Sequence, residues 1–502
     1  MINSKTAYIF FSMMAFMLFN FIKEYNYIYN NHKWIYMLLK ITSIDSRGFG
    51  IAKDSKGNKY KILGALPNEV VSVRIIKQNK KNIYAVIDKV IEASKFRVEP
   101  KDIDSYLSSS VWQILDFKQE NIYKSEIVKS EFNKFIKIDK FEVVSQDEQD
   151  SWNYRNKAEM QFCLHDEKLS YAFYSQGESW QKIPVQNSSI FSEVINAESK
   201  KILYFLNKSG ISVDKLRYII LRSFNNRSLS KIARILRQAP VFAKATPGRQ
   251  DERPLMVSEV EPYERVVALL CLEKDAIKSI ETEAEAQKLI SENLKSIIFA
   301  IPKADSYEII TKIGDSELKE KVLEKSFYFD FDHFFQINIP MFERAISDIK
   351  QLLDDKKLED STLVDLFAGV GVIGLLLADK FKKVIGVEIS SGTKEFALKN
   401  AQINNITNYE FYESDINNAL ELVQKADILV VDPPRGGLTP QLIDSIKKYL
   451  PKYIIYLSCN HETFVNDLSL LHDNYEIKFL RGYNFFPHTP HIECLAFLQR
   501  RW

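Results

Sequence analysis

The chain is poor in cysteine, glycine and proline. Its 502 residues include only four cysteines, 16 glycines and 15 prolines. So few glycines and prolines argue against long disordered tracts. The cysteines have no close spacing of the kind that metal ligands show, and their number argues against a disulfide framework. We therefore expect no metal site and a reducing environment. The four thiols are Cys163, Cys271, Cys459 and Cys494.

An excess of one charge is missing as well. The 68 Lys and Arg residues are nearly balanced by 66 Asp and Glu residues, which leaves a net charge of +2. No global positive field therefore points to nucleic acid, and any nucleic-acid site must be local. One window, residues 222–249, has basic residues and no acidic ones, and it is either a local RNA-binding face or an ordinary solvated surface. Its basic residues are Arg222, Arg227, Lys231, Arg234, Arg237, Lys244 and Arg249.

The N-terminal extension, residues 1–36, contains an apolar stretch without charge at residues 6–22. Seventeen residues is the lower limit for a membrane span. Three interpretations remain open: a membrane anchor, the apolar region of a signal peptide without a convincing cleavage site, or translation that starts at Met37. Apart from this stretch, the composition indicates a cytoplasmic protein.

The length allows roughly three domains. Residues 37–95 read as short strands separated by turns, which predicts an OB-like β-barrel. Residues 96–330 read as mixed α+β, with a helical stretch near 113–136. In residues 331–502 strands and helices alternate, which predicts an α/β fold with a doubly wound, mostly parallel sheet. The last two strands have no helix between them, so we expect an antiparallel hairpin at the sheet edge.

A glycine-rich turn in the C-terminal domain predicts a cofactor site. It follows a strand, opens a helix and has glycines at the spacing of a dinucleotide-binding turn. Glu388 ends the next strand, where a carboxylate can accept both ribose hydroxyls. NAD and S-adenosylmethionine both fit, but Asp365 before the first glycine favours S-adenosylmethionine, because it can face the amino-acid end of that ligand. Asp415 lies near the adenine or is an ordinary turn residue. The glycines are Gly369, Gly371 and Gly374.

Two further strand ends carry reactive groups. Asp432 is followed by Pro-Pro-Arg, and prolines after a strand stiffen the turn that holds the carboxylate. Cys459 ends the next buried strand. Together they suit methylation of pyrimidine carbon 5, where a thiolate first adds to carbon 6. A base must then remove the carbon-5 proton; Glu493 is the leading candidate, with His488 and His491 as alternatives, unless Glu493 is a salt-bridge partner.

These motifs match a known family. From about residue 38 to 502 the chain resembles the RNA uracil-5-methyltransferases, in particular the ribosomal-RNA members with an N-terminal TRAM barrel. The matching motifs are residues 152–157 (WNYRNK), 335–338 (FQIN), 365–371 (DLFAGVG), Glu388, 432–438 (DPPRGGL), 458–460 (SCN) with Thr463 and Asp467, and 486–493 (FPHTPHIE).

The resemblance implies a Rossmann-like domain that binds S-adenosylmethionine, with Cys459 as the nucleophile and Glu493 as the base. It also implies that the barrel and the central region bind folded RNA, with ribosomal RNA favoured over transfer RNA. We expect the protein to be a monomer. The helical stretch would pack back on the catalytic domain, and the target base would be flipped out. The implied cofactor-binding residues are Gln336, Phe367, Glu388 and Asp432.

The chain departs from the family in three places. Many members carry four cysteines that bind an iron-sulfur cluster; here the corresponding positions, near 100–102, 107–110 and Ser188, have no cysteine, so we expect no cluster. His461 replaces a usual proline, and Val372 replaces a commonly polar residue. Three other functions remain open: formation of 5-methylcytidine, a catalytically silent RNA-binding protein and, more distantly, an NAD dehydrogenase.

Overall fold

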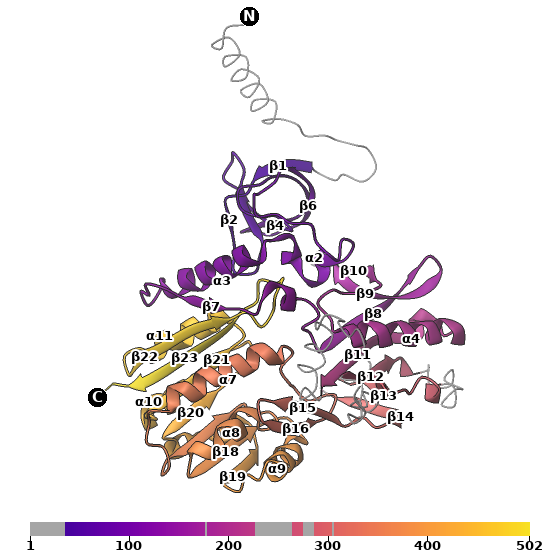
Figure 1. Ribbon diagram of the computed structural model, residues 1–502. Coiled ribbons are helices and arrows are strands. Elements are labelled where there is room, and N and C mark those ends of the chain that lie inside the picture. Colours follow the sequence, from indigo (N-terminus) through magenta and orange to yellow (C-terminus); the bar gives the residue numbers. More distant parts are fainter. Residues whose placement is uncertain (1–35, 176–177, 226–263, 275–285, 304–305, 502) are drawn as a thin grey trace, which may run out of the picture. The chain divides into compact units, whose positions relative to one another are not determined.

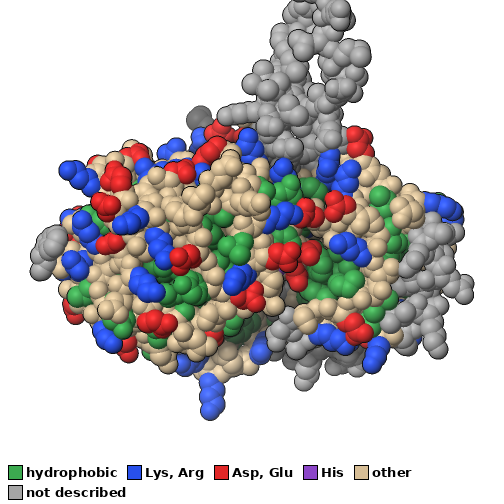
Figure 2. All heavy atoms as spheres, turned by 90° about the horizontal axis from the view of Figure 1, so that it is seen from below, with side chains coloured by type: hydrophobic (Ala, Val, Ile, Leu, Met, Phe, Trp, Pro, Cys, Tyr) green, Lys and Arg blue, Asp and Glu red, His purple; other side chains and the backbone are tan. Residues whose placement is uncertain are grey.

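The computed structural model describes residues 36–175, 178–225, 264–274, 286–303 and 306–501. The apolar stretch at residues 6–22 and most of the basic window therefore lie outside the described residues. In the part of the chain that is described, no helix is both long enough and apolar enough to cross a membrane. Acidic and basic side chains are interspersed over the face shown in Figure 2, as the near-zero net charge leads one to expect.

The described chain forms two compact units, and the first contains residues up to 120 together with 174–183 and 488–490. Its strands curl around a common interior (Figure 1), in the order β1-β5-β6-β4-β3-β2. Tyr60, Ile62, Val71 and Val73 fill this interior. The elements are β1 (Tyr36–Lys40), β2 (Ser43–Ile44), β3 (Gly50–Lys53), β4 (Lys59–Leu63), β5 (Val70–Gln78), β6 (Ile83–Glu92), α2 (Tyr106–Ser109) and η1 (Val111–Ile114).

The second unit begins within helix α3 (Phe117–Phe132) and contains the central sheet. Its strands β9-β8-β11-β12-β13-β14 are adjacent in that order. Helix α4 (Glu193–Ser209) buries Ile195, Ile202 and Leu206 in the core of this sheet. The remaining bounds are η2 (Glu148–Ser151), β8 (Lys157–His165), β9 (Lys168–Ser175), η3 (Val213–Lys215), β11 (Leu216–Asn225), β12 (Glu264–Leu272), β13 (Leu294–Pro302) and β14 (Tyr307–Gly314). Strand β10 (Glu178–Val185) belongs to the first unit up to residue 183.

Arg222, which the sequence placed on a basic face, lies inside the molecule. It is 2% exposed, and its guanidinium donates to the carbonyls of His333 (2.5 Å) and Phe335 (3.1 Å) and stacks on Phe329. Burial lowers its pKa to about 10, so it keeps its charge at neutral pH. The expectation was wrong for Arg222, because position in a basic run does not reveal which side chain points inward.

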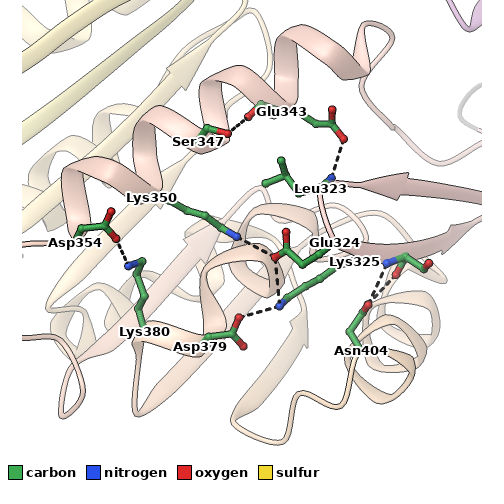
Figure 3. A network of polar contacts seen from close by, with 11 residues as sticks. Leu323, Glu324, Lys325, Glu343, Ser347, Lys350, Asp354, Asp379, Lys380 and Asn404 are labelled. Carbon is green, nitrogen blue, oxygen red and sulfur yellow. Dashed lines mark hydrogen bonds and ion pairs between the residues drawn. The ribbon is translucent and has the colours of Figure 1, made fainter. Parts of the chain in front are cut away.

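A hairpin, β15 (Leu318–Val322) and β16 (Lys325–Phe329), leads into the C-terminal sheet. Figure 3 shows its turn bound on several sides: the Leu323 amide donates to Glu343 of α7, Glu324 pairs with Lys350 of α7, and Lys325 pairs with Asp379. Exposed ion pairs contribute little each. Together with the backbone contact they fix the position of the hairpin turn.

The C-terminal sheet has the order β19-β18-β17-β20-β21-β23-β22-β7. β17 to β21 are parallel, and all residues of β20 and β21 are buried, as continuous apolar runs predict. The bounds are α7 (Ile339–Leu353), β17 (Thr362–Leu366), α8 (Val372–Leu377), η6 (Ala378–Lys380), β18 (Lys383–Glu388), α9 (Thr393–Ile403), β19 (Tyr409–Glu413), η7 (Ile416–Asn418), η8 (Leu420–Lys425), β20 (Ile428–Val431), α10 (Pro440–Tyr449), β21 (Tyr453–Ser458), α11 (His461–Leu471), β22 (Tyr475–Tyr483) and β23 (Glu493–Arg500).

The last two strands pair antiparallel, as predicted, but they do not form the sheet edge. β23 inserts between β21 and β22, and β7 (Glu142–Val144), from far upstream in the chain, adds to β22. The segment before β7 packs here too: Val128 and Phe132 of α3 lie in the same core as Phe464 of α11.

A buried carboxylate joins α7 to β22. Asp348 is 6% exposed and accepts from the Arg481 guanidinium (2.8 Å) and the Tyr483 hydroxyl (2.6 Å). Asp348→Ala should lower the free energy of unfolding by about 3 kcal/mol, because the buried Tyr483 hydroxyl loses its acceptor and the Arg481 guanidinium keeps only Glu142. Arg344→Ala, which removes an exposed partner of the same carboxylate at 3.6 Å, should cost below about 0.5 kcal/mol. Urea denaturation of both variants checks this, and equal losses would contradict it.

Candidate active site

Parallel pairing brings three predicted residues to one edge of the sheet. Leu366 is the register partner of both Val387 and Val431. The next residue on each strand is therefore Phe367, Glu388 and Asp432, respectively. Ligands of open α/β sheets bind at such carboxyl ends.

Antiparallel pairing places the predicted nucleophile and base together. Ser458, the last residue of β21, is the register partner of Cys494 in β23. One step further along the same register, Cys459 lies opposite Glu493. Side chains directly opposite on neighbouring strands share a face of the sheet and lie close together. The two residues are 34 positions apart in sequence, so this closeness depends wholly on the strand pairing.

The glycine turn is shaped by backbone conformations that side chains rarely adopt. Phe367 has φ 65°, and Gly369 and Gly371 have φ 54° and 86°. A Cβ atom on Gly369 would meet nothing within 4 Å, whereas one on Gly371 would lie 2.7 Å from the Tyr409 hydroxyl. The space next to Gly369 is therefore free for a ligand, whereas the space next to Gly371 is filled by Tyr409. A non-glycine residue at positive φ, as at Phe367, is typical of functional sites.

Glu388 supports this turn from the neighbouring strand. Its Oε2 accepts from the Gly369 amide (3.1 Å), and its Oε1 accepts from the amide and hydroxyl of Ser390 (3.0 and 2.8 Å). Oε1 also accepts from the Ile389 amide (3.0 Å) and is fully used. Oε2 has only the Gly369 amide as a partner, and a carboxylate oxygen offers about two acceptor sites, so Oε2 can accept one further bond from a ligand.

Asp365 lies beneath the turn and does not line it. It is 1% exposed, and its Oδ2 accepts from the Gly374 amide at 2.9 Å. Its Oδ1 has no hydrogen-bond partner among the described residues. Burial raises the pKa of Asp365 to about 8, and the charges of Asp432 and Glu388 add to the effect. Contact with the amino-acid end of a cofactor, as the sequence suggested, does not fit this burial.

Gln336 reaches the site from the segment after β16. Its Nε2 lies 3.5 Å from Oδ2 of Asp432, at the limit of a hydrogen bond. The main chain of Gln336 is held by Asn156, whose Nδ2 donates to the Gln336 carbonyl (3.0 Å) and whose amide donates to Ile337 (3.3 Å). One structural role of the motif at residues 152–157 is therefore to hold the main chain of Gln336 and Ile337 through Asn156.

Negative groups surround the thiol. Burial raises the pKa of Cys459 to about 11; Glu493 and Asp432 raise it further, and Arg435 opposes them. Burial also raises the pKa of Asp432 and, with the charge of Asp432, that of Glu493. Glu493 is 2% exposed, and its Oε1 has no hydrogen-bond partner among the described residues. At neutral pH the thiol is therefore protonated, and Arg435 is the neighbouring charge that favours the thiolate.

Helix α11 holds the loop that follows Asp432. Asn460 Nδ2 and Thr463 Oγ1 donate to the Arg435 carbonyl at 2.8 and 3.3 Å. Asp467 accepts from the Leu438 amide at 2.8 Å. The segment carrying Cys459 and the loop carrying Asp432 are therefore tied to one another.

The other candidates lie elsewhere or have local roles. Asp415 caps η7 by accepting from the Asn417 amide, and no contact joins its side chain to the residues above. His488 belongs to the first compact unit, where its ring packs on Phe117. His461 is the first residue of α11, a position where proline is also favoured. Within the described ranges, no three His, Cys, Asp or Glu side chains gather as a metal-ligand set.

Comparison with known proteins agrees with these motifs. A family model described as tRNA (uracil-5-)-methyltransferase matches residues 266–501, which include the strand ends described above. An uncharacterized RNA methyltransferase of Caldanaerobacter subterraneus is 28% identical over 92% of this chain and 98% of its own length. One of Clostridium acetobutylicum is 26% identical, with coverage of 92% and 97%.

Residues 266–501 thus resemble the RNA uracil-5-methyltransferase family, and nearly the whole chain resembles curated RNA methyltransferases. The Pyrococcus abyssi tRNA (uracil-54, C5)-methyltransferase, solved in complex with S-adenosyl-L-homocysteine, has the same fold as this chain. The two align with a TM-score of 0.67 at 20% identity, over 92% of this chain and all of the other. The Rossmann-like fold class expected from the sequence is thereby confirmed.

Sequence reasoning assigned no role in this methyltransferase to several residues that hold the site in place. Asn156, Arg222 and Asn400 all donate to main-chain carbonyls of residues 328–370. Asn156 lies in the motif at residues 152–157, so the sequence does point to its importance. For Arg222 and Asn400 the sequence pattern carries no such signal, because their partners are backbone atoms.

Gly437 tests how tightly the Asp432 loop is packed. Its φ is 77°, and an added Cβ would lie 2.6 Å from Oδ2 of Asp467. Gly437→Ala should therefore lower the free energy of unfolding by roughly 2 kcal/mol or more. Gly436→Ala is the matched control, because its Cβ would meet nothing within 4 Å, and it should stay within about 0.5 kcal/mol. Chemical denaturation measures both; an equal response would contradict this packing.

Asp365 predicts a pH dependence of stability. Because its pKa is raised in the folded state, its protonated form favours folding at low pH, and this contribution is lost as pH rises from about 4 through 8. Asp365→Asn cannot ionise and keeps an acceptor for Gly374. Between pH 5 and 8 the free energy of unfolding should fall less steeply with pH in the variant than in the wild type. The difference between the two slopes should be up to about 1.4 kcal/mol per pH unit. Parallel curves from urea titrations would refute the buried-acid assignment.

Proposed function

We propose that the protein transfers a methyl group from S-adenosylmethionine to carbon 5 of a uridine in structured RNA, through a covalent adduct at Cys459. The observation that carries the proposal is the strand register that sets Cys459 opposite Glu493, beside the edge with Asp432 and the glycine turn. A nucleophile facing a buried carboxyl, next to a cofactor cradle, suits covalent catalysis followed by proton removal.

The residues present fit S-adenosylmethionine. A Cβ atom at Gly369 would meet nothing within 4 Å, so a ligand can approach the backbone there, and Oε2 of Glu388 can accept one further bond. Phe367, Glu388, Gln336 and Asp432 would hold the cofactor, whose role is to supply an electrophilic methyl group. Asp415 would take part only at the outer edge, since its side chain already caps η7. The Pyrococcus abyssi relative was solved with S-adenosyl-L-homocysteine, which supports this choice of cofactor.

The chain's own groups would act in sequence. The Cys459 thiol first gives up its proton to solvent. The resulting thiolate adds to carbon 6 of uracil, the carbon 5–carbon 6 double bond opens, and carbon 5 becomes nucleophilic. After carbon 5 has been methylated, Glu493 in its ionised form removes the carbon-5 proton. The double bond re-forms as the carbon 6–sulfur bond breaks, which frees the thiolate. Burial of Glu493 raises the basicity of its carboxylate, which favours this proton removal.

Ribosomal RNA is the proposed substrate class, because the N-terminal barrel resembles that of the ribosomal-RNA members. The family model and the Pyrococcus abyssi enzyme are named for transfer RNA, so transfer RNA is the alternative substrate. The 5-methylcytidine alternative uses the same thiol chemistry on a different base. Nucleoside mass spectrometry of ribosomal and transfer RNA, each purified from cells with and without the protein, distinguishes these three products.

Cys459→Ala should abolish methyl transfer to RNA, by at least about 10³-fold, because no other group can activate carbon 5. Cys163→Ala, which removes a thiol from strand β8, is the control and should keep the wild-type rate. Incorporation of a radiolabelled methyl group into RNA measures both. Transfer by Cys459→Ala at the wild-type rate would refute the nucleophile. No transfer by the wild type to any RNA would support a silent RNA-binding protein instead.

A further inference from the structure

Two asparagines, Asn400 of α9 and Asn404 at the C-cap of that helix, clamp the hairpin strand β16. Asn404 accepts from the Ser326 amide (3.0 Å) and donates to the Ser326 carbonyl (2.7 Å), as Figure 3 shows for its labelled side chain. Asn400, one turn earlier on the helix, does the same with Tyr328: Oδ1 accepts from its amide (2.6 Å) and Nδ2 donates to its carbonyl (3.0 Å). Each side-chain amide thus bonds to the N–H and the C=O of one β16 residue, as the backbone of a neighbouring strand would.

The two asparagines differ in their remaining hydrogen bond. Nδ2 of Asn400 also donates to the carbonyl of Val370 at 3.1 Å, and Val370 lies between Gly369 and Gly371 of the glycine turn. Nδ2 of Asn404 donates instead to the carbonyl of Asn400 in its own helix, at 2.7 Å. Asn400 is 0% exposed, so its bond to the turn does not compete with water.

Asn400 therefore joins two sides of the cofactor site. On one side is the glycine turn, whose conformation depends on Gly369 and Gly371. On the other is β16, which continues into the segment that carries Gln336. That segment is fixed at its far end, because Arg222 donates to the carbonyls of His333 and Phe335. A shift of β16 away from Val370 would separate the turn from the Gln336 side chain.

We propose that Asn400 is a positioning residue that holds the glycine turn in register with the Gln336 segment and so preorganises the cofactor site. This inference rests on the proposed function, since it takes the glycine turn as the S-adenosylmethionine cradle. Preorganisation raises affinity by reducing what must be ordered on binding. Loss of the Asn400 amide should thus weaken cofactor binding while RNA binding, which does not use this bond, stays unchanged.

The test compares Asn400→Asp with Asn404→Asp in the full chain. Each substitution keeps the size and one acceptor but replaces the amide donor with an oxygen that faces carbonyls. S-adenosylhomocysteine is titrated into each protein by calorimetry, and the melting temperature is measured without ligand. We expect the larger loss of melting temperature for Asn400→Asp, because Asn400 is fully buried and Asn404 is not. In the folded proteins the dissociation constant should be about tenfold higher for Asn400→Asp and less than about threefold higher for Asn404→Asp. The dissociation constant for RNA should stay within about twofold for both.

Three results would count against the inference. Equal weakening by both variants would mean that the clamp on β16 is purely structural. Wild-type affinity in a folded Asn400→Asp would mean that the Val370 bond has no effect on binding. If wild-type protein itself fails to bind S-adenosylhomocysteine, the proposed function fails and the inference fails with it. Should the Asp variants not fold, Asn400→Ala and Asn404→Ala are compared at a temperature below both midpoints, with the same expected difference.

Discussion

The antiparallel pairing of β21 with β23 is the constraint on which the proposed chemistry depends. Its register runs from Tyr453 with Gln499 to Ser458 with Cys494, without interruption. Backbone hydrogen bonds join alternate pairs along this register, and a slip of one residue would turn Glu493 to the other face of the sheet. The facing of Cys459 and Glu493 is therefore a property of the whole sheet, supported by a strand core in which β21 is fully buried.

Burial and the neighbouring charges determine which groups of the site carry protons. Burial and two neighbouring carboxyls keep the Cys459 thiol protonated, and burial and mutual repulsion favour a proton on the pair formed by Asp432 and Glu493. A neutral thiol is a weak nucleophile and is less prone to oxidation. The thiol must therefore lose its proton before it can attack, and Arg435 is the neighbouring charge that favours this loss.

Much of the site could be read from the sequence, because strand-end motifs carry position as well as chemistry. Phe367, Glu388 and Asp432 each follow an apolar run, and parallel strands bring such residues to one edge. The facing of Cys459 and Glu493 could not be derived from spacing alone. It requires β23 to insert between β21 and β22, and sequence order by itself suggests a simple edge hairpin. The addition of β7 to the edge is equally non-local, since its partner β22 lies more than 300 residues downstream. The inward direction of Arg222 and the main-chain contacts of Asn400 are decided by packing, which composition does not encode.

Trapping of the adduct tests the central claim most directly. Glu493→Gln keeps the size of the side chain but cannot remove the carbon-5 proton, so the enzyme should remain bound to its methylated RNA. The variant is incubated with RNA and S-adenosylmethionine, denatured and digested, and the linked peptide is identified by mass spectrometry. Covalent catalysis predicts a methylated nucleotide attached to the peptide that contains Cys459. Release of methylated RNA at the wild-type rate with no linked peptide, or a link to another cysteine, would contradict it.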